Sequence, residues 1–139
     1  MPPAAPANVT AAVERIRRAI GPLACLEAPE QIEPYLVDFR ALYRGSTPLV
    51  VCPGSTAEVA AVAKLCAAAG APIVPQGGNT GLVVGGIPDE SGREVVLSLT
   101  RLNRIRSIDA ANLTMTVDAG CVLQNLQQAA EDAGFLFPL

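Results

Sequence analysis

Apolar residues recur every third or fourth position in three segments of the chain, which is the spacing of amphipathic helices. The segments are residues 9–20, 55–69 and 122–133. The second segment opens with Ser-x-x-Glu, the pattern of a helix capping box, and each of the three is followed by a glycine. The pattern therefore predicts three helices, and a shorter helical turn is predicted at residues 30–36.

Short apolar runs between these helices predict strands instead, because they are too brief for a stable helix. The runs are residues 48–53, 73–75, 94–99 and 135–139. A hairpin is predicted from residues 104–109 and 113–119, since apolar and polar residues alternate along the second arm and a polar turn separates the two arms.

The order strand, helix, strand over residues 48–75 indicates a βαβ unit, so its two strands are expected to be parallel and joined by a right-handed crossover. The predicted fold class is α+β with an α/β-like first part: a small mixed sheet with the parallel βαβ unit, a following hairpin, and helices packed on it. Residues 1–8 are expected to be disordered, 9–47 to form a helical segment, and 48–139 to form the main subdomain. Because the chain stops on an apolar run, that subdomain is expected to be cut short.

A glycine-rich stretch, Pro-Gln-Gly-Gly-Asn-Thr-Gly-Leu at residues 75–82, follows the second strand and has the composition of a phosphate cradle. Glycines leave no Cβ between a ligand and the main chain, so successive N–H groups can converge on an anion. Asn79 and Thr80 would add short side-chain donors. No charged residue occurs from Pro75 to Pro88, so an anion held here would be held by oriented amide dipoles.

The glycine-rich stretch matches neither of two common phosphate-binding patterns. No Gly-Lys-Ser or Gly-Lys-Thr follows it, as in a P-loop, and it lacks the G-x-G-x-x-G spacing of dinucleotide-binding folds. A surface loop whose glycines serve only the turn is the other interpretation. Gly120, between a predicted strand and a helix, leaves the same choice between a second ligand contact and a plain turn glycine.

Charge and cysteine content narrow the function classes. The chain has 139 residues and a net charge of −3, with no basic cluster larger than the three arginines of residues 15–18, so a nucleic-acid partner is not expected. The four cysteines show no Cys-x-x-Cys spacing, so neither a zinc site nor a redox pair is indicated.

The absence of histidine removes histidine-based acid–base chemistry and histidine metal ligands. No metal site and no catalytic residue is therefore assigned. No apolar run has the roughly 20 residues of a membrane span, and the N-terminus lacks the features of a signal peptide. A cytoplasmic location is expected.

Several motifs, in order, resemble those of flavoproteins of the vanillyl-alcohol oxidase and p-cresol methylhydroxylase type. Within that group the chain is most similar to the FAD-linked D-2-hydroxy acid dehydrogenases, which include D-2-hydroxyglutarate, D-lactate and glycolate dehydrogenases. The resemblance runs from about Tyr35 to the last residue. It rests on Pro53-x-Ser55-x-x-Glu58-Val59, Pro72-Ile73-Val74-Pro75-Gln76-Gly77-Gly78-Asn79-Thr80-Gly81, Leu97-Ser98-Leu99 with Arg101-Leu102-Asn103-Arg104-Ile105, Ala119-Gly120-Cys121, and Phe137-Pro138-Leu139.

This resemblance implies an incomplete FAD-binding fold of the p-cresol methylhydroxylase type whose glycine loop wraps the FAD diphosphate. FAD would be bound non-covalently, since the chain has no histidine to attach it. A small 2-hydroxy acid would bind through a region missing here, and the full-length enzyme could form a homodimer. The cofactor-binding residues implied are Pro75, Gln76, Gly77, Gly78, Asn79, Thr80, Gly81, Leu82, Gly120, Pro138 and Leu139.

Three functions remain open from the sequence. The first is the FAD-binding portion of a dehydrogenase acting on the CH–OH group of a D-2-hydroxy acid, with the isolated chain expected to be inactive. The second is a truncated or degenerate fragment without catalysis, because a few charge-assisted bonds of ~1.5–3 kcal/mol each barely offset an association cost of ~4–15 kcal/mol. The third is another oxidoreductase of the same flavin fold.

Overall fold

The computed structural model describes residues 7–139, so most of the predicted disordered segment lies outside it. The last two residues of the segment predicted to be disordered, Ala7 and Asn8, belong to the first helix, and the Asn8 side-chain amide donates a hydrogen bond to the Ala69 carbonyl at 2.7 Å. The elements are α1 (Ala7–Ile20), the 3-10 helix η1 (Pro22–Ala24), β1 (Cys25–Leu26), α2 (Pro29–Ile32), the 3-10 helix η2 (Glu33–Tyr35), β2 (Val50–Val51), α3 (Thr56–Ala69), β3 (Ile73–Gln76), β4 (Val95–Ser98), β5 (Ile105–Asp109), β6 (Thr114–Val117) and α4 (Leu123–Asp132).

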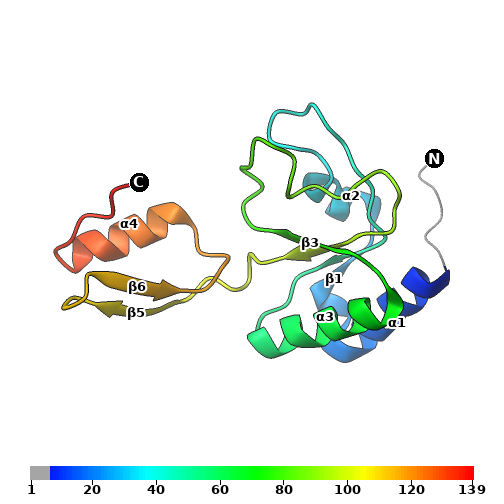
Figure 1. Cartoon of the computed structure of the whole chain (residues 1–139), viewed down its shortest axis with the longest axis horizontal. Coiled ribbons are helices and arrows are strands. Elements are labelled where there is room, and N and C mark those ends of the chain that lie inside the picture. The colour runs from blue at the N-terminus through cyan, green and yellow to red at the C-terminus, as the bar shows by residue number, and fades with distance from the viewer. Residues whose placement is uncertain (1–6) are drawn as a thin grey trace.

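A four-stranded mixed sheet with strand order β1-β2-β4-β3 forms the centre of the larger part of the molecule (Figure 1). The strands β2, β4 and β3 are parallel to one another, and β1 is antiparallel to β2. The predicted parallel βαβ unit is therefore confirmed, but its two strands are not neighbours. The third predicted strand, β4, lies between them, with Val96 opposite both Val50 and Val74.

Helices α1 and α3 cover one face of this sheet, and α2 lies on the other face (Figure 1). The apolar stripe of α1 and the inner face of α3 meet side chains of β2 and β4 in one aliphatic cluster. Burying each such side chain contributes roughly 1.5–3 kcal/mol. The buried members are Val9, Val13, Ile16, Leu49, Val51, Val62, Cys66, Ala71, Val95 and Leu97.

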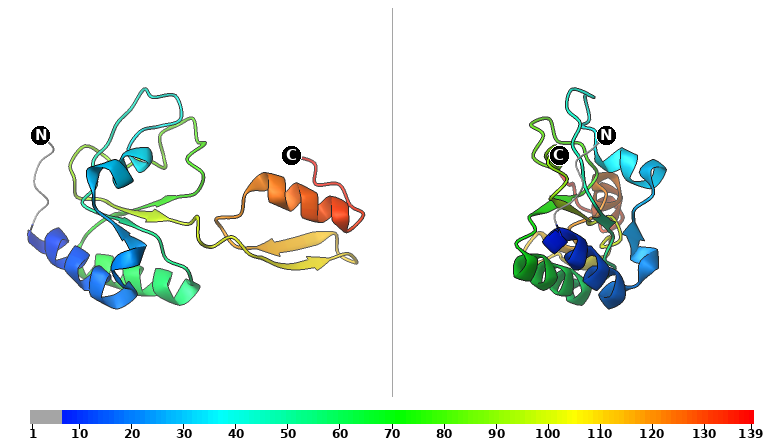
Figure 2. Two further views of the ribbon diagram at one scale, coloured as in Figure 1. Left: turned by 180° about the vertical axis from the view of Figure 1, so that it is seen from behind. Right: turned by 90° about the vertical axis from the view of Figure 1, so that its right-hand side faces the viewer.

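The hairpin and the last helix form a separate unit beside the sheet (Figure 2). Strands β5 and β6 pair only with each other, as a two-stranded antiparallel sheet, and α4 packs over one side of it. Asp118 stabilises the base of the hairpin, where its carboxylate accepts a hydrogen bond from Arg106 Nε at 2.5 Å. This hydrogen bond is the main reason why the pKa of Asp118 lies below its ordinary value.

Two expectations from the sequence differ from the structure. The predicted strand at 135–139 does not form, because no other strand among residues 7–139 lies beside it to supply hydrogen bonds, and Leu136 and Leu139 are more than 80% exposed. The predicted helical segment 9–47 also contains β1, an edge strand too short for its pattern to be visible in the sequence. A strand needs a partner as well as a pattern.

Candidate cofactor-binding site

The glycine-rich stretch leaves the carboxyl end of β3 and folds into an open loop, residues 77–86, called here the glycine loop. Ligands of open α/β sheets commonly bind at the carboxyl ends of the strands. The loop encloses a hollow of about 260 Å³ that is lined by Pro75, Gln76, Gly77, Gly78, Asn79, Thr80, Gly81, Val84, Gly86 and Ile87. The structure thus brings seven of the eleven predicted cofactor-binding residues together.

The glycines of this loop have no need to be glycine within the chain itself. A Cβ added to Gly77, Gly81 or Gly85 would meet no atom within 4 Å, and one added to Gly78 would make only an ordinary contact at 3.9 Å. None of these residues has a positive φ. The free space beside their main chain fits an external group that approaches the backbone closely.

Backbone donors in the glycine loop are also uncommitted. None of the amides of residues 77–86 donates a hydrogen bond to another group among residues 7–139. Main-chain N–H groups are strong donors that require a partner, and several of them converging on one point make an anion-binding concavity. The residues present therefore fit the diphosphate of a dinucleotide cofactor.

Gln76 closes the glycine loop at its base. Its side chain is 3% exposed, and its Nε2 donates to the Gly86 carbonyl at 2.7 Å and to the Tyr35 carbonyl at 3.1 Å. The first bond joins the two ends of the loop. The second connects the loop to residues 34–44, which follow α2 and are called here the strap.

Asn79 also faces the strap. Its Nδ2 donates to the Val37 carbonyl at 2.9 Å and to the Pro34 carbonyl at 3.4 Å, and its φ of 52° places it in the left-handed region. From the sequence, the Asn79 amide is predicted to be a donor for the ligand, but in the structure both bonds of that amide group go to the protein. Thr80 is exposed and lies within the lining of the hollow.

Arg40 of the strap brings a positive charge to a loop that has no charged residue of its own. Its guanidinium donates to the Leu82 carbonyl at 2.6 Å, and the strap and the glycine loop lie side by side in Figures 1 and 2. This residue was missed in the sequence analysis, because 42 positions separate it from its partner. The polar composition of residues 38–45 was the only local signal.

Asp38 holds the turn that presents Arg40. The buried Asp38 carboxylate accepts hydrogen bonds from the backbone N–H groups of Tyr43 at 2.6 Å, Leu42 at 2.7 Å and Arg40 at 3.1 Å. These bonds, that of Tyr43 first, lower the pKa of Asp38. An ion pair between Arg44 and Glu33 fastens the base of the strap.

Four predicted cofactor-binding residues lie outside the lining of the hollow. Leu82 continues the glycine loop beyond it, and Pro138 and Leu139 lie in the tail after α4, on the separate hairpin unit. Gly120 has a structural reason of its own, because an added Cβ would lie 1.8 Å from the Leu99 carbonyl oxygen. Its role toward a ligand stays a prediction.

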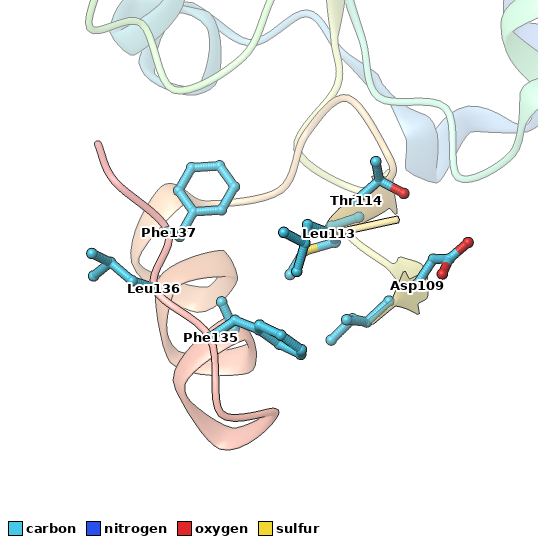
Figure 3. Close-up of a pocket in the computed structure, with 9 residues that line it drawn as sticks. Asp109, Leu113, Thr114, Phe135, Leu136 and Phe137 are labelled. Atoms are coloured by element: carbon cyan, nitrogen blue, oxygen red, sulfur yellow. The ribbon is translucent and has the colours of Figure 1, made fainter. Parts of the chain in front are cut away.

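A second hollow, of about 320 Å³, lies between the hairpin, α4 and the tail (Figure 3). It is lined mostly by apolar side chains, among them Leu113, Phe135 and Phe137. The Asp109 carboxylate at its edge points away from the phenyl rings and is bonded within its own turn to Ala111 and Asn112. The hollow therefore offers an apolar surface and no free charged group.

Other chemistry is limited among residues 7–139. They contain no group of three or more His, Cys, Asp or Glu side chains placed to hold a metal ion, and none of their helices has the length and apolar character to cross a membrane. The four cysteines are unpaired thiols, and burial raises the pKa of Cys66.

Comparison with known proteins shows the family to which the chain belongs. Residues 47–139 match a protein family described as an FAD binding domain. The chain is 36% identical over 127 residues to a protein of Oryza sativa subsp. indica named probable D-2-hydroxyglutarate dehydrogenase, mitochondrial. It is 38% identical over 122 residues to a D-lactate dehydrogenase of Anaerostipes hadrus.

The solved structure of p-cresol methylhydroxylase with substrate bound has the same fold over 97% of this chain, with a TM-score of 0.76 at 19% identity. This confirms the predicted fold class. The match to the Oryza sativa protein covers 91% of this chain but only 22% of that protein. The match to the Anaerostipes hadrus protein covers 87% of this chain and 25% of that protein, and the p-cresol methylhydroxylase chain is covered to 27%. The chain thus spans about a quarter or less of the length of the relatives it matches.

Proposed function

Because the chain belongs to the FAD binding domain family, with FAD as its cofactor, we propose that it is the diphosphate-binding portion of a flavin-dependent oxidoreductase acting on the CH–OH group of a D-2-hydroxy acid. The observation that carries the proposal is the glycine loop. Its amides have no hydrogen-bond partner among residues 7–139, and the space beside Gly77, Gly78 and Gly81 is open. Oriented amides there would hold the FAD diphosphate.

FAD, when bound, supplies the acceptor for the hydride taken from the substrate carbon. The contribution of this chain is to bind and orient the cofactor non-covalently. No residue of the hollow is a candidate base, because its lining contains no Asp, Glu, Lys, Tyr or Cys. The group that takes the hydroxyl proton would belong to another part of the protein.

The 2-hydroxy acid class is supported by two relatives, named a D-2-hydroxyglutarate dehydrogenase and a D-lactate dehydrogenase, that are more than a third identical to this chain. The identity of the substrate, the formation of a homodimer and the cytoplasmic location are properties of the whole protein, and all three stay predictions. The rice relative is named mitochondrial, which makes the location a point for direct measurement.

Cofactor binding is best tested by NMR, which detects weak binding, on the uniformly ¹⁵N-labelled chain. Addition of FAD, or of ADP as its diphosphate-bearing half, is expected to shift the amide resonances of Gly77, Gly78 and Gly81. Riboflavin, which has no phosphate, is the matched control and should leave them in place. Loop resonances that respond equally to all three compounds, or to none, would contradict diphosphate binding here.

Substrate class is tested on the protein as its cell makes it. With FAD bound, it is expected to reduce an artificial electron acceptor in the presence of D-2-hydroxyglutarate or D-lactate and not of the L-enantiomers. Equal rates with a sugar or a phenol would favour another oxidoreductase of the same flavin fold instead.

A further inference from the structure

We propose that the strap holds the glycine loop in its binding shape before the cofactor arrives, and that Gln76, Asn79 and Arg40 are positioning residues whose side-chain donors bind the protein and not the cofactor. The inference rests on the proposed function for the identity of the ligand. Its structural half, the fixing of the loop by the strap, can be tested without any ligand.

Polar side chains of the loop and the strap donate to carbonyl groups of the protein. The donors of Gln76 and Asn79 point back to carbonyl groups of the strap or of the loop base, and Arg40 points forward from the strap to the Leu82 carbonyl. Every one of these bonds joins a side chain to a backbone carbonyl. Of the five accepting carbonyl groups, two belong to the glycine loop, those of Leu82 and Gly86, and three belong to the strap. The bonds thus join the loop to the strap without using the loop amides, which have no hydrogen-bond partner among residues 7–139.

The strap is itself held in shape by its own hydrogen bonds. Asp38 accepts three backbone N–H groups, the Gly45 N–H donates to the Leu36 carbonyl at 2.9 Å, and Val37 pairs with Arg44 in an isolated β-bridge. Gly45, the residue directly after the strap, packs so closely against Pro88 that an added Cβ would lie 1.8 Å from the Pro88 carbonyl oxygen. The end of the strap is thus anchored to the segment that follows the loop.

A loop rich in glycine loses much conformational entropy when it is ordered, and a ligand that has to order it binds more weakly. Hydrogen bonds to the strap order the loop during folding, so the loss of conformational entropy does not have to be offset by ligand binding. The strap therefore determines affinity through the shape of the glycine loop, without contact to the cofactor.

The test uses the Asn79→Asp variant, which keeps the size of the side chain and tolerance of the left-handed backbone but replaces the donor by an acceptor facing two carbonyl oxygens. In the FAD-free wild-type chain, ¹⁵N order parameters of residues 77–86 are expected near the rigid value of about 0.85. In the variant they should fall below about 0.6, the value typical of flexible backbone.

FAD affinity of the Asn79→Asp variant, measured by the same amide titration, is expected to fall on the order of tenfold, as expected when preorganisation is lost. Asn125→Asp is the matched control, because it makes the same chemical change on the exposed face of α4, away from the loop. It should change neither quantity.

Arg40→Ala provides an independent variant if Asn79→Asp fails to fold, since Arg40 is exposed and its loss leaves no buried group unpaired. It should loosen residues 82–86 and weaken FAD binding several-fold. Unchanged loop order in Asn79→Asp would overturn the proposal, because any loss of FAD binding would then come from residue 79 itself, through a lost contact or through repulsion between the new carboxylate and the diphosphate. A wild-type loop that is already mobile would overturn it as well.

The two proposals fail in different ways. If the wild-type loop is rigid, and loosens in the variants, but FAD and ADP shift no loop amide, the strap mechanism stands and the diphosphate assignment fails. If FAD shifts the loop amides while both variants retain ordered loops, the assignment stands and the positioning role fails.

Discussion

Glycines serve two distinct purposes in this chain, and the atoms around each one separate them. Gly120 approaches the Leu99 carbonyl oxygen so closely that a side chain cannot fit. Gly77 has nothing within 4 Å of a Cβ position and no positive φ. The fold explains the first glycine, whereas the second has no explanation in the fold and fits the proposed ligand.

Alanine substitutions at these two positions should therefore have opposite effects. Gly77→Ala is expected to leave the free energy of unfolding unchanged or to raise it by up to about 1 kcal/mol, because alanine restricts the unfolded chain, while FAD binding weakens. Gly120→Ala is expected to lower the free energy of unfolding by about 1–3 kcal/mol through overpacking.

Urea denaturation and FAD titration of both variants check this prediction. A Gly77→Ala protein that binds FAD as tightly as wild type would show that the space beside the loop is not used by the cofactor.

At the residue scale, composition was enough to locate the glycine loop but not to orient its side chains. Asn79 was expected to face the ligand because short amides commonly bind phosphates, yet its partners are carbonyls more than 40 positions earlier. Arg40 was missed for the same reason. Contacts between distant segments depend on the path of the backbone, which no local pattern contains.

At the scale of elements, the strap depends on the ionised Asp38 carboxylate. Asp38 has a pKa below its ordinary value of 3.8 because backbone N–H groups, that of Tyr43 first, bind its charged form. Its stabilising contribution is therefore fully present above pH 3.8, the ordinary value, and is lost as the pH falls through the lower folded-state pKa.

We expect Asp38→Asn to lower the melting temperature at neutral pH and to make the decline in stability below about pH 4 shallower than in wild type. Thermal unfolding followed by circular dichroism between pH 2 and pH 7 measures both effects. Parallel acid profiles for the two proteins would show that Asp38 is not responsible for the decline.

The start of α3 follows the predicted capping box, except that the Glu58 carboxylate binds the N–H of Gly54, one residue before the Ser55 N-cap. The Ser55 hydroxyl accepts a hydrogen bond from the Glu58 N–H at 3.2 Å, and the Glu58 carboxylate accepts one from the Gly54 N–H at 2.7 Å. Ser55→Ala is expected to cost about 1 kcal/mol of stability, measured by urea denaturation. Ser55→Asp keeps an acceptor and should restore most of the loss.

Helices were predicted more reliably than strands because their signals are local. The Ser55 cap and the left-handed Gly70, with φ of 62°, begin and end α3 within one stretch of sequence. The strand predicted at residues 135–139 has the right composition and no neighbour. The position of β4 between β2 and β3 likewise depends on pairing between distant segments.

Taken as a whole, the molecule consists of a well-packed sheet domain and a thinly packed hairpin unit. The aliphatic cluster of the sheet domain contains ten buried residues, whereas α4 buries only Ala130. Two-stranded sheets are marginally stable by themselves. The hairpin unit is therefore expected to open more readily than the rest.

Amide hydrogen exchange should show this difference. Hydrogen-bonded amides of β5, β6 and α4 are expected to exchange at least tenfold faster than those of β3 and β4 under native conditions, a gap of about 1.4 kcal/mol in opening free energy. Limited proteolysis provides a second measurement, with first cleavage expected near residues 99–104. Uniform protection across both parts would show that they unfold together.

The sequence by itself determined the three main helices, the hairpin, the parallel βαβ unit, the glycine loop and the family, because each depends on residue types at short, fixed spacings. Only the tertiary structure decided the strand order, the lack of a strand at residues 135–139, and the bonds by which the strap holds the glycine loop. Those features arise where segments distant in the chain meet, and hydrogen bonds between them form only once the whole backbone has taken its path.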